Sequence, residues 1–366
     1  MQGVFLILYV TELPPLPWPL TVAGLPLYIA TNEFDIPWPF GTPKNHSRSH
    51  VLEDIDAQEY VSDEIFMTVI KWFDECSNVT ISSILWSAGT WHVTIPDDCN
   101  TSDLPSRVCR ASCSYLYQSE VPEQPEAAFR QQHPATIRDE SAYDILRPGV
   151  MVSSDKFLGD GPVPPRSELF TTAGVLVKDK HGDEFVTVAN HGFPLGEETV
   201  FHPSPRGTVI GTVERRLGET DLALVRLRDG VIFENKCFQS TSHPTVIEFT
   251  QVVESVNELK LGDVLHMDNP FTGHIESVYY GTARRRIPRY ENSPEFLWVT
   301  QDWGYFGQHA DSIPAEGSCG SAVWDNNGKL VCFFRYLTKS GPRANFGFGI
   351  SAMELKNFGL ELSGGH

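Results

Sequence analysis

The sequence predicts a mainly β protein in which a smaller α+β unit precedes a larger all-β domain. From about residue 147 onward, short apolar stretches alternate with turns of Gly, Asp and Pro at intervals of roughly eight to twelve residues, which is typical of sandwiches and barrels. Before residue 120, one segment carries apolar residues at helical spacing, and two strand-like segments follow it. We therefore expect an α+β unit over residues 1–120, a connector over 121–145 and the β domain over 146–366.

The amino-terminal unit is expected to contain one helix and two strands. Apolar residues recur every three or four positions from Ala57 to Glu75, as they do on one face of a helix. The strand-like segments Val79–Leu85 and Trp91–Ile95 follow. The apolar run Val4–Val10 is either a buried first strand or the core of a signal peptide, although no Lys or Arg precedes it. It is far too short to span a membrane.

The connector and the β domain differ in composition. Residues 121–145 are rich in Glu, Gln, Pro and Arg and hold few large apolar side chains. After them we expect about twelve strands and a final short helix over Ala352–Phe358. The expected strands are Val150–Ser153, Thr172–Lys178, Phe185–Ala189, Thr208–Arg215, Leu222–Leu227, Val246–Phe249, Val264–Met267, His274–Ala283, Phe296–Gln301, Ser321–Trp324, Leu330–Tyr336 and Phe346–Ser351.

Charge and motif content argue against several classes of function. The formal net charge is −19, whereas sequence-independent binding of nucleic acid or of an anionic membrane needs clustered Lys and Arg. The one basic cluster, Arg284-Arg285-Arg286 with Arg289, is short, and we interpret it as a solvated hairpin edge, with a patch for an acidic partner as the alternative. The chain has no Gly-x-Gly-x-x-Gly, P-loop or His-Glu-x-x-His motif, and no cofactor is expected.

Three segments of the β domain together meet the requirements of nucleophilic acyl transfer. The nucleophile must sit on a tight turn beside backbone N–H groups that stabilise an oxyanion, and Gly317 and Gly320 around Cys319 permit such a turn. His191 ends a predicted strand and is the candidate base. Asp221 precedes another predicted strand and is the candidate carboxylate that orients the imidazole. A thiol reacts as the thiolate, which a neighbouring imidazolium favours.

These segments resemble motifs of the trypsin/chymotrypsin-like protease family. Val188-Ala189-Asn190-His191 resembles Thr-Ala-Ala-His, and Thr220-Asp221-Leu222-Ala223-Leu224 resembles Asp-Ile-Ala-Leu. Gly317-Ser318-Cys319-Gly320 resembles Gly-Asp-Ser-Gly with Cys in place of Ser, as in viral chymotrypsin-like cysteine proteases. The order His, Asp, nucleophile is that of this fold. The resemblance covers residues 147–358 and implies a double six-stranded β-barrel; in general texture the chain also resembles trypsin-like proteins of filamentous fungi.

The resemblance implies roles for further residues around the nucleophile. It makes the backbone N–H groups of Gly317 and Cys319 the oxyanion donors. It puts a specificity pocket near Ile313, Pro314, Ala315 and Phe334, where no carboxylate is available for Arg or Lys, so a neutral, apolar pocket is expected. Trypsin-like zymogens carry an Asp before the nucleophile to receive a freed amino terminus. This chain has Ser318 there, so activation of that kind is not expected.

Two functions remain open. One is a cysteine endopeptidase that uses a Cys-His-Asp triad on a peptide or protein substrate. The other is a catalytically inactive protease-like scaffold that binds a peptide or protein partner. The oligomeric state is not predicted. All three candidate residues could instead have purely structural roles. Cys319 would then be a buried core cysteine, His191 would be a strand-end histidine bonded to the backbone, and Asp221 would cap a turn. The other histidines lack a partnering motif and are interpreted as structural: His181, His202, His243, His266, His274 and His309.

The cysteines leave the cellular compartment open. Seven is an odd number, so at least one thiol is free. Among Cys76, Cys99, Cys109 and Cys113 only the last two are close in sequence, which favours disulfides or free thiols over zinc, and no metal site is predicted. Cys237 and Cys332 are expected in the core or paired. Sequons at Asn45, Asn78 and Asn100 lean toward secretion, but a reduced nucleophile favours the cytosol.

Overall fold

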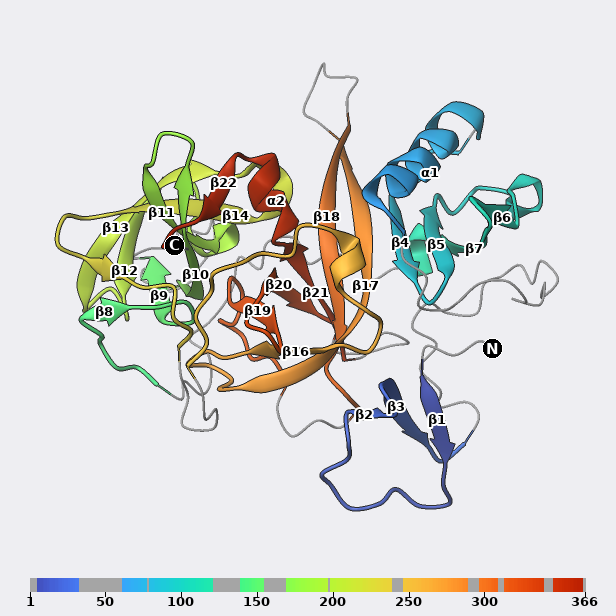
Figure 1. Ribbon diagram of the computed structural model, residues 1–366, viewed down its shortest axis with the longest axis horizontal. Helices are drawn as coiled ribbons and strands as arrows, with labels where there is room; N and C mark the ends of the chain where they lie inside the picture. The colour runs from blue at the N-terminus through green and yellow to red at the C-terminus, as the bar shows by residue number, and fades with distance from the viewer. Residues whose placement is uncertain are drawn as a thin grey trace, which may run out of the picture.

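A computed structural model of the chain describes ten stretches of it. They are residues 5–32, 61–77, 79–120, 139–154, 169–196, 198–238, 246–288, 296–308, 313–338 and 345–364. Figure 1 shows two β-barrels side by side, an α+β unit beyond the second barrel and a small separate sheet below it. In the described residues, no helix has the length and apolar character needed to cross a membrane.

The first barrel is a closed ring of six antiparallel strands. The strand order is β11-β14-β13-β12-β9-β10, and the pairing of β10 with β11 closes the ring. Strand β22 (Leu360–Leu362) adds to the edge of β10. The interior is filled by alternate apolar side chains, among them Val152, Val188 and Val225. The six strands are β9 (Met151–Ser154), β10 (Leu169–Asp179), β11 (Glu184–Ala189), β12 (Thr199–His202), β13 (Thr208–Arg216) and β14 (Leu222–Leu227).

The second barrel repeats this design. Its order is β16-β19-β20-β21-β18-β17, and the pairing of β16 with β17 closes it. One apolar cluster crosses between the barrels, because Val177 and Phe185 of the first pack with Trp324 and Phe333 of the second. Helix α2 (Met353–Asn357) follows the last strand of the ring. The six strands are β16 (Val264–Met267), β17 (Ile275–Pro288), β18 (Phe296–Tyr305), β19 (Ala322–Asp325), β20 (Leu330–Leu337) and β21 (Phe346–Ser351).

The amino-terminal unit extends the sheet of the second barrel. Strand β4 pairs antiparallel with the distal half of β17, and the sheet continues through β5, β7 and β6. Helix α1 (Asp63–Cys76) packs an apolar face onto these strands, where Phe66 meets Trp91 edge-on at 5.1 Å. Each fully buried aromatic of this kind contributes about 1.5–3 kcal/mol. The strands are β4 (Ser83–Ser87), β5 (Thr90–Ile95), β6 (Arg107–Val108) and β7 (Ala111–Tyr117).

Short elements complete the structure. Strands β1 (Leu6–Tyr9), β2 (Thr21–Val22) and β3 (Leu25–Ala30) form the small sheet, and β8 (Ile145–Leu146) pairs with β15 (Ile232–Phe233). The 3-10 turns are η1 (Thr101–Asp103), η2 (Gln118–Glu120), η3 (Asn190–Gly192), η4 (Gly218–Thr220) and η5 (Val256–Glu258).

The predicted mainly β architecture with two six-stranded barrels is confirmed, and several local predictions need correction. The apolar run at the start is a strand, but Leu6, Leu8 and Tyr9 are 40–54% exposed, so it is not buried. The segment Val246–Phe249 forms one isolated bridge and not a strand. Strand β12 was not predicted, because four residues with only two large apolar side chains give little periodic signal.

The division into three domains stays a prediction. Most of the connector, residues 121–138, lies outside the described residues, as do residues 57–60 of the predicted helix. Helix α1 begins after Ser62, whose hydroxyl accepts a hydrogen bond from the Ile65 N–H at 3.3 Å.

The basic cluster on β17 is not a solvated edge. Arg284 is 8% exposed, and its guanidinium pairs with Asp63 of α1 at 3.2 Å. Arg286 pairs with Asp74 of the same helix at 2.8 Å. Helix α1 therefore covers the predicted hairpin edge, and its carboxylates pair with arginines of this cluster within the same chain. Arg289 lies outside the described residues. A run of arginines in the sequence does not reveal that a helix packs over it, because that helix comes from a distant part of the chain.

Candidate active site

The three candidate catalytic residues lie on loops where the two barrels meet. His191 is in the turn η3 after β11, and Asp221 follows the turn η4 before β14. Strands β11 and β14 are paired neighbours, with Ala189 opposite Leu222, so the two side chains are brought together. Cys319 precedes β19, and its carbonyl accepts a hydrogen bond at 3.0 Å from a backbone N–H of β10. The fold thus assembles residues that are 30 and 98 positions apart.

Asp221 is fixed against His191 by backbone and side-chain hydrogen bonds. The Asp221 backbone is left-handed, with φ of +59°, a conformation that Asp tolerates better than most residues. Its carbonyl accepts from the Asn190 N–H at 2.7 Å, and Oδ1 accepts from the His191 N–H at 2.9 Å. Oδ2 lies 2.7 Å from His191 Nδ1. A carboxylate only accepts, so Nδ1 carries a proton and Nε2 is left for the nucleophile.

The surroundings of His191 favour the charged, imidazolium form of its side chain. Burial of the side chain, which is 3% exposed, opposes the charge. The Asp221 carboxylate and then the neighbouring Cys319 outweigh burial and raise the pKa of His191 to about 9. Next to a thiol, an imidazolium favours the thiolate form that attacks carbonyl carbon.

This raised pKa predicts how the free energy of unfolding depends on pH. The ordinary pKa of histidine is 6.5 and that of His191 is about 9, so its stabilisation is complete below pH 6.5 and is lost as the pH rises toward 9. The loss is on the order of 3 kcal/mol. We expect urea unfolding at pH 6 to 10 to show wild type and His191→Gln converging as the pH rises. His202→Gln is the control, since burial lowers the pKa of His202. A constant difference between wild type and His191→Gln would contradict the prediction.

The loop of Cys319 is held in a tight, glycine-dependent shape. Gly317 and Gly320 have φ of +94° and +88°. A Cβ on Gly320 would come within 2.5 Å of the Thr172 carbonyl oxygen, so the loop lies directly against β10. The Thr172 hydroxyl in turn donates to the Gly317 carbonyl at 2.9 Å. Among the described residues, no hydrogen bond occupies the backbone N–H of Gly317 or Cys319, which leaves both available to an oxyanion.

The same loop is anchored from behind by the turn between β16 and β17. Ser318 is fully buried and shares a hydrogen bond of 2.9 Å with the Thr272 hydroxyl, which also accepts from the Ala315 N–H at 3.0 Å. The Asn269 amide donates to the Ser321 hydroxyl at 3.1 Å. Asn269 and Thr272 were not predicted as site residues. A turn signature predicts a turn, but it does not say which loop the turn will contact.

Arg335 is a further site residue that sequence reasoning missed. Its Nε lies 2.5 Å from Asp221 Oδ2, and its side chain is 13% exposed. Burial opposes ionisation of Asp221, but His191 and Arg335 together hold the pKa of that carboxyl below its usual range. The Arg335 carbonyl also accepts from the Cys319 thiol at 3.1 Å. Arg335 therefore contacts two of the three candidate residues.

The residues predicted to bind substrate fall into two groups. Ile313 is 45% exposed, Pro314 is buried, and Ala315 packs against a small apolar cluster beneath the loop. Phe334 is 6% exposed and lies in the core of the second barrel, with its ring 5.9 Å from that of Phe306. The predicted substrate contact of Phe334 is therefore not expected, because this packed core side chain has almost no surface to offer.

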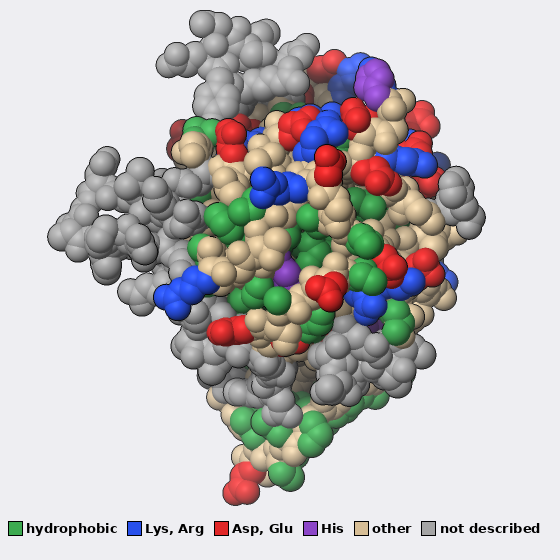
Figure 2. All heavy atoms as spheres, turned by 90° about the vertical axis from the view of Figure 1, so that its left-hand side faces the viewer, with side chains coloured by type: hydrophobic (Ala, Val, Ile, Leu, Met, Phe, Trp, Pro, Cys, Tyr) green, Lys and Arg blue, Asp and Glu red, His purple; other side chains and the backbone are tan. Residues whose placement is uncertain are grey.

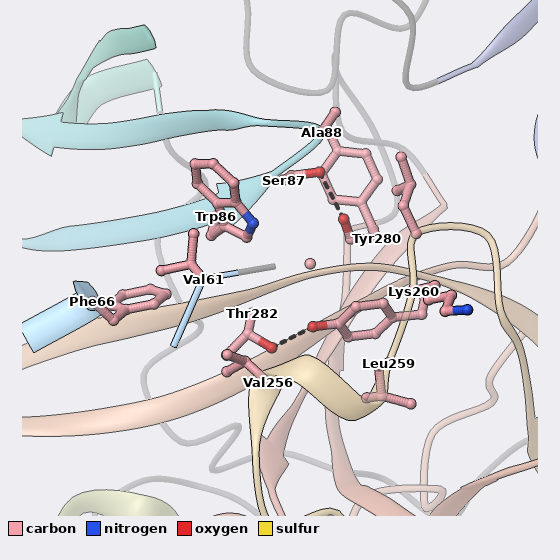
Figure 3. A pocket seen from close by; sticks show the side chains of 13 residues that line it. Val61, Phe66, Trp86, Ser87, Ala88, Val256, Leu259, Lys260, Tyr280 and Thr282 are labelled. Carbon is pink, nitrogen blue, oxygen red and sulfur yellow. Dashed lines mark hydrogen bonds between the residues drawn. The ribbon is translucent and has the colours of Figure 1, made fainter. Parts of the chain in front are cut away.

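A pocket lies elsewhere, between the amino-terminal unit and the second barrel (Figure 3). Its wall includes the Ser87 hydroxyl, which donates to the Tyr280 carbonyl at 2.7 Å. None of its residues belongs to the triad or to the Cys319 loop, so we assign it no part in the chemistry. It is lined by Val61, Phe66, Trp86, Ser87, Ala88, Val256, Leu259, Lys260, Leu261, Tyr279, Tyr280, Gly281 and Thr282.

The surface of the first barrel carries mixed charge. Figure 2 shows the side of the molecule where this barrel lies, with acidic and basic side chains interspersed around apolar ones. In the part of this face that the structure describes, positive charge does not gather into an extended field.

Comparisons with known proteins find similarity in structure alone. No family model and no curated protein matches the chain. Solved structures that resemble it include a glutamic acid specific serine protease, at 14% identity over 59% of this chain and 100% of its own, with a TM-score of 0.40. Thermobifida fusca protease A is 14% identical over 60% and 98%, with a TM-score of 0.40. Cellulomonas bogoriensis chymotrypsin gives the same figures with a TM-score of 0.41.

At such identities the likeness concerns the fold and not the activity. The fold itself follows from the two closed six-stranded rings and their order along the chain. The protein has the mainly β, chymotrypsin-like double barrel that the sequence predicted.

Proposed function

We propose that this protein is a peptidase of chymotrypsin-like fold that uses Cys319, His191 and Asp221 for acyl transfer. The observation that supports this most strongly is the buried imidazole of His191, which is bonded to Asp221 at 2.7 Å and lies near enough to Cys319 for that group to raise its pKa. A histidine with only a structural role does not need both a carboxylate partner and a neighbouring thiol. The unoccupied N–H groups of Gly317 and Cys319 add the means to stabilise an oxyanion.

The reaction follows from these contacts. The Cys319 thiolate attacks the scissile carbonyl carbon, and the carbonyl π electrons move onto oxygen, where the N–H groups of Gly317 and Cys319 stabilise the negative charge. The tetrahedral intermediate collapses, the C–N bond breaks, and the His191 imidazolium gives its Nε2 proton to the leaving amine. His191 then takes a proton from the water molecule that attacks the thioester carbonyl carbon; the C–S bond breaks, the acid leaves, and the Cys319 thiolate is restored beside the imidazolium. Asp221 keeps the imidazole in place through both steps.

A peptide library tests this function. We expect the wild-type protein to cleave members of a mixed peptide library, read by mass spectrometry, and Cys319→Ala to lose that cleavage. With Ile313, Pro314 and Ala315 beside the loop and no carboxylate among them, cleavage after apolar or small residues is expected. Cleavage that persists in Cys319→Ala would exclude the cysteine mechanism, and strict cleavage after Arg or Lys would exclude the neutral pocket.

One observation favours the alternative of an inactive binding scaffold. The Cys319 thiol donates to the Arg335 carbonyl at 3.1 Å, so its proton has a backbone acceptor in the structure. If this bond holds the thiol protonated, the fold would keep the triad pattern without turnover. The scaffold function predicts that the same library shows no cleavage, while a peptide or protein binds at the Cys319 loop.

Arg335 should tune the imidazole, because its guanidinium neutralises part of the Asp221 charge. In Arg335→Gln the carboxylate is less compensated, so the pKa of His191 should rise above that of wild type. The shift can be followed by NMR titration of the His191 ring protons. Arg226→Gln is the matched control, since Arg226 pairs with Glu214 on the barrel surface. An unchanged or lowered pKa of His191 in Arg335→Gln would show that Arg335 does not tune the imidazole.

A further inference from the structure

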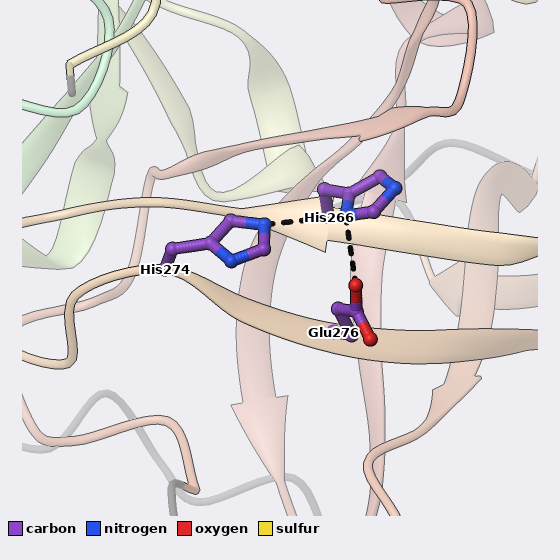
Figure 4. A group of neighbouring side chains, drawn as sticks. All are labelled: His266, His274 and Glu276. Atoms are coloured by element: carbon purple, nitrogen blue, oxygen red, sulfur yellow. Dashed lines mark hydrogen bonds and ion pairs between the residues drawn. The ribbon is translucent and has the colours of Figure 1, made fainter. Parts of the chain in front are cut away.

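Three potential metal ligands converge on the second barrel. They are His266 on β16, His274 just before β17 and Glu276 on β17, and one ligand atom from each lies within 4.8 Å of the others. Figure 4 shows that both partners approach the same nitrogen of His266. His266 Nδ1 lies 3.2 Å from His274 Nε2 and 3.8 Å from Glu276 Oε1. His266 and Glu276 stand directly opposite each other in the β16–β17 register, so the strands hold this pair on one face.

The spacing matches what zinc requires. Two nitrogen ligands at about 2.0–2.1 Å from a tetrahedral Zn²⁺ are roughly 3.3 Å apart. The two histidine nitrogens already stand at 3.2 Å, and the Glu276 side chain, which is 53% exposed, can close the remaining distance by a small rotation. Two imidazoles and one carboxylate are also a donor set that suits Zn²⁺. Water would complete the coordination on the exposed side.

The surroundings of His266 prepare its Nδ1 as a ligand. Its other nitrogen, Nε2, lies 2.8 Å from the Asn326 amide oxygen, which can only accept, so Nε2 carries the proton and Nδ1 the lone pair. Such a partner on the second ring nitrogen is what orients metal-bound histidines. The ring also stacks on Trp324, at 6.1 Å and 29°, and its side chain is 11% exposed. His266 is therefore rigid before any ion arrives.

We propose that His266, His274 and Glu276 form a binding site for one Zn²⁺ ion. When the metal binds, His274 Nε2 gives up to solvent the proton that it shares with His266 Nδ1, and His274 Nδ1 takes one up, so the imidazole stays neutral and both lone pairs face the ion. The carboxylate of Glu276 binds in its ionised form, so the ion and its three ligands together carry one positive charge and no net proton is released.

The position of this site gives it a structural role. His266 and His274 stand at the two ends of the turn 267–273, and this turn carries Asn269 and Thr272, which anchor the Cys319 loop from behind. A metal that joins the ends of the turn would restrict the movement of both anchors. Bound Zn²⁺ would thus stiffen the loop that positions the nucleophile, without touching the triad.

Titration of the full-length Cys319→Ala protein with Zn²⁺ and Co²⁺ tests the site, because that background removes the zinc-binding thiol of the triad. We expect one Zn²⁺ per chain by calorimetry, at micromolar concentrations. Bound Co²⁺ should show a d–d spectrum without the thiolate-to-cobalt charge-transfer absorption that a cysteine site would give. His274→Gln and Glu276→Gln should each weaken binding by at least the roughly 10–100-fold that loss of a partner behind a ligand costs, whereas His181→Gln, a change of an exposed histidine elsewhere, should not weaken it.

Amide hydrogen exchange supplies a readout that is independent of peptidase activity. Zinc should slow exchange in residues 313–321 of the Cys319→Ala protein, and this protection should be absent in Cys319→Ala/His274→Gln. Binding that survives both ligand substitutions, a thiolate charge-transfer band, or no binding at all would overturn the proposal. If His274→Gln lowers the melting temperature of the metal-free protein, the result is judged from Glu276→Gln alone, because Glu276 is exposed and its replacement should not disturb folding. Failure of the zinc site would leave Cys319 reactivity unchanged, so the two proposals fail separately.

Discussion

Replacing Asp221 by asparagine should slow acylation of Cys319 by about 10²–10⁴-fold. The amide lacks the charge that, together with Cys319, raises the pKa of His191 to about 9, and its NH₂ group cannot accept the Nδ1 proton. The imidazole would then lose both its charge and its preferred tautomer. The rate can be measured as the acylation burst with an activated ester, which reacts with any activated thiol and does not depend on knowing the substrate.

Asp179→Asn is the matched control for this substitution. Asp179 lies at the end of β10, where it pairs with Arg215 at 3.4 Å on the barrel surface. Its replacement removes a carboxylate and an ion pair without touching the site, and we expect the burst rate to stay within about twofold of wild type. An equally small effect of Asp221→Asn would show that the carboxylate does not assist His191, and the proposed triad would be wrong.

Gly320→Ala should destabilise the protein by about 2–5 kcal/mol. The substitution combines strain at φ of +88° with steric overlap, because the new Cβ would lie 2.5 Å from the Thr172 carbonyl oxygen and 3.0 Å from the Ala189 nitrogen. Both neighbours are backbone atoms of the first barrel and cannot rotate away. The loop would therefore be pushed from β10, and the hydrogen bond from Thr172 to the Cys319 carbonyl would be lost with it.

Gly230→Ala is the control that separates backbone strain from steric overlap. Gly230 has φ of +85°, but no atom lies within 4 Å of an added Cβ. It should cost only the backbone strain, about 1 kcal/mol. Urea unfolding of both variants measures the difference in the free energy of unfolding. Equal losses would mean that close contact between the Cys319 loop and β10 contributes nothing.

The triad candidates could be found from sequence because each carries its signal within a few residues. His191 and Asp221 stand at the ends of apolar strand segments, and Cys319 stands between glycines that a tight turn requires. Strand pairing between β11 and β14 then brings the first two together. Their roles in a reaction stay predictions, since contact is a condition of catalysis and not a proof of it.

What the sequence did not predict depends on contacts between distant segments. Arg335 of the second barrel contacts Asp221 of the first, and Asn269 contacts the Cys319 loop from another hairpin. Glu276 follows His274 by two residues in the sequence, but only the β16–β17 register brings Glu276 opposite His266. The basic residues of β17 were wrongly interpreted as solvated because α1, which covers them, is coded some 200 residues earlier.

The measurement that tests the central proposal most directly is rate-resolved alkylation of the native protein with iodoacetamide, read at each cysteine by mass spectrometry. All seven cysteines are unpaired in the structure, so the other six serve as internal references. If Cys319 and His191 form a reactive pair, Cys319 should label fastest near pH 6, and His191→Ala should remove that advantage. Labelling of Cys319 that is no faster than that of exposed Cys76 and Cys109, or that is unchanged in His191→Ala, would contradict the account.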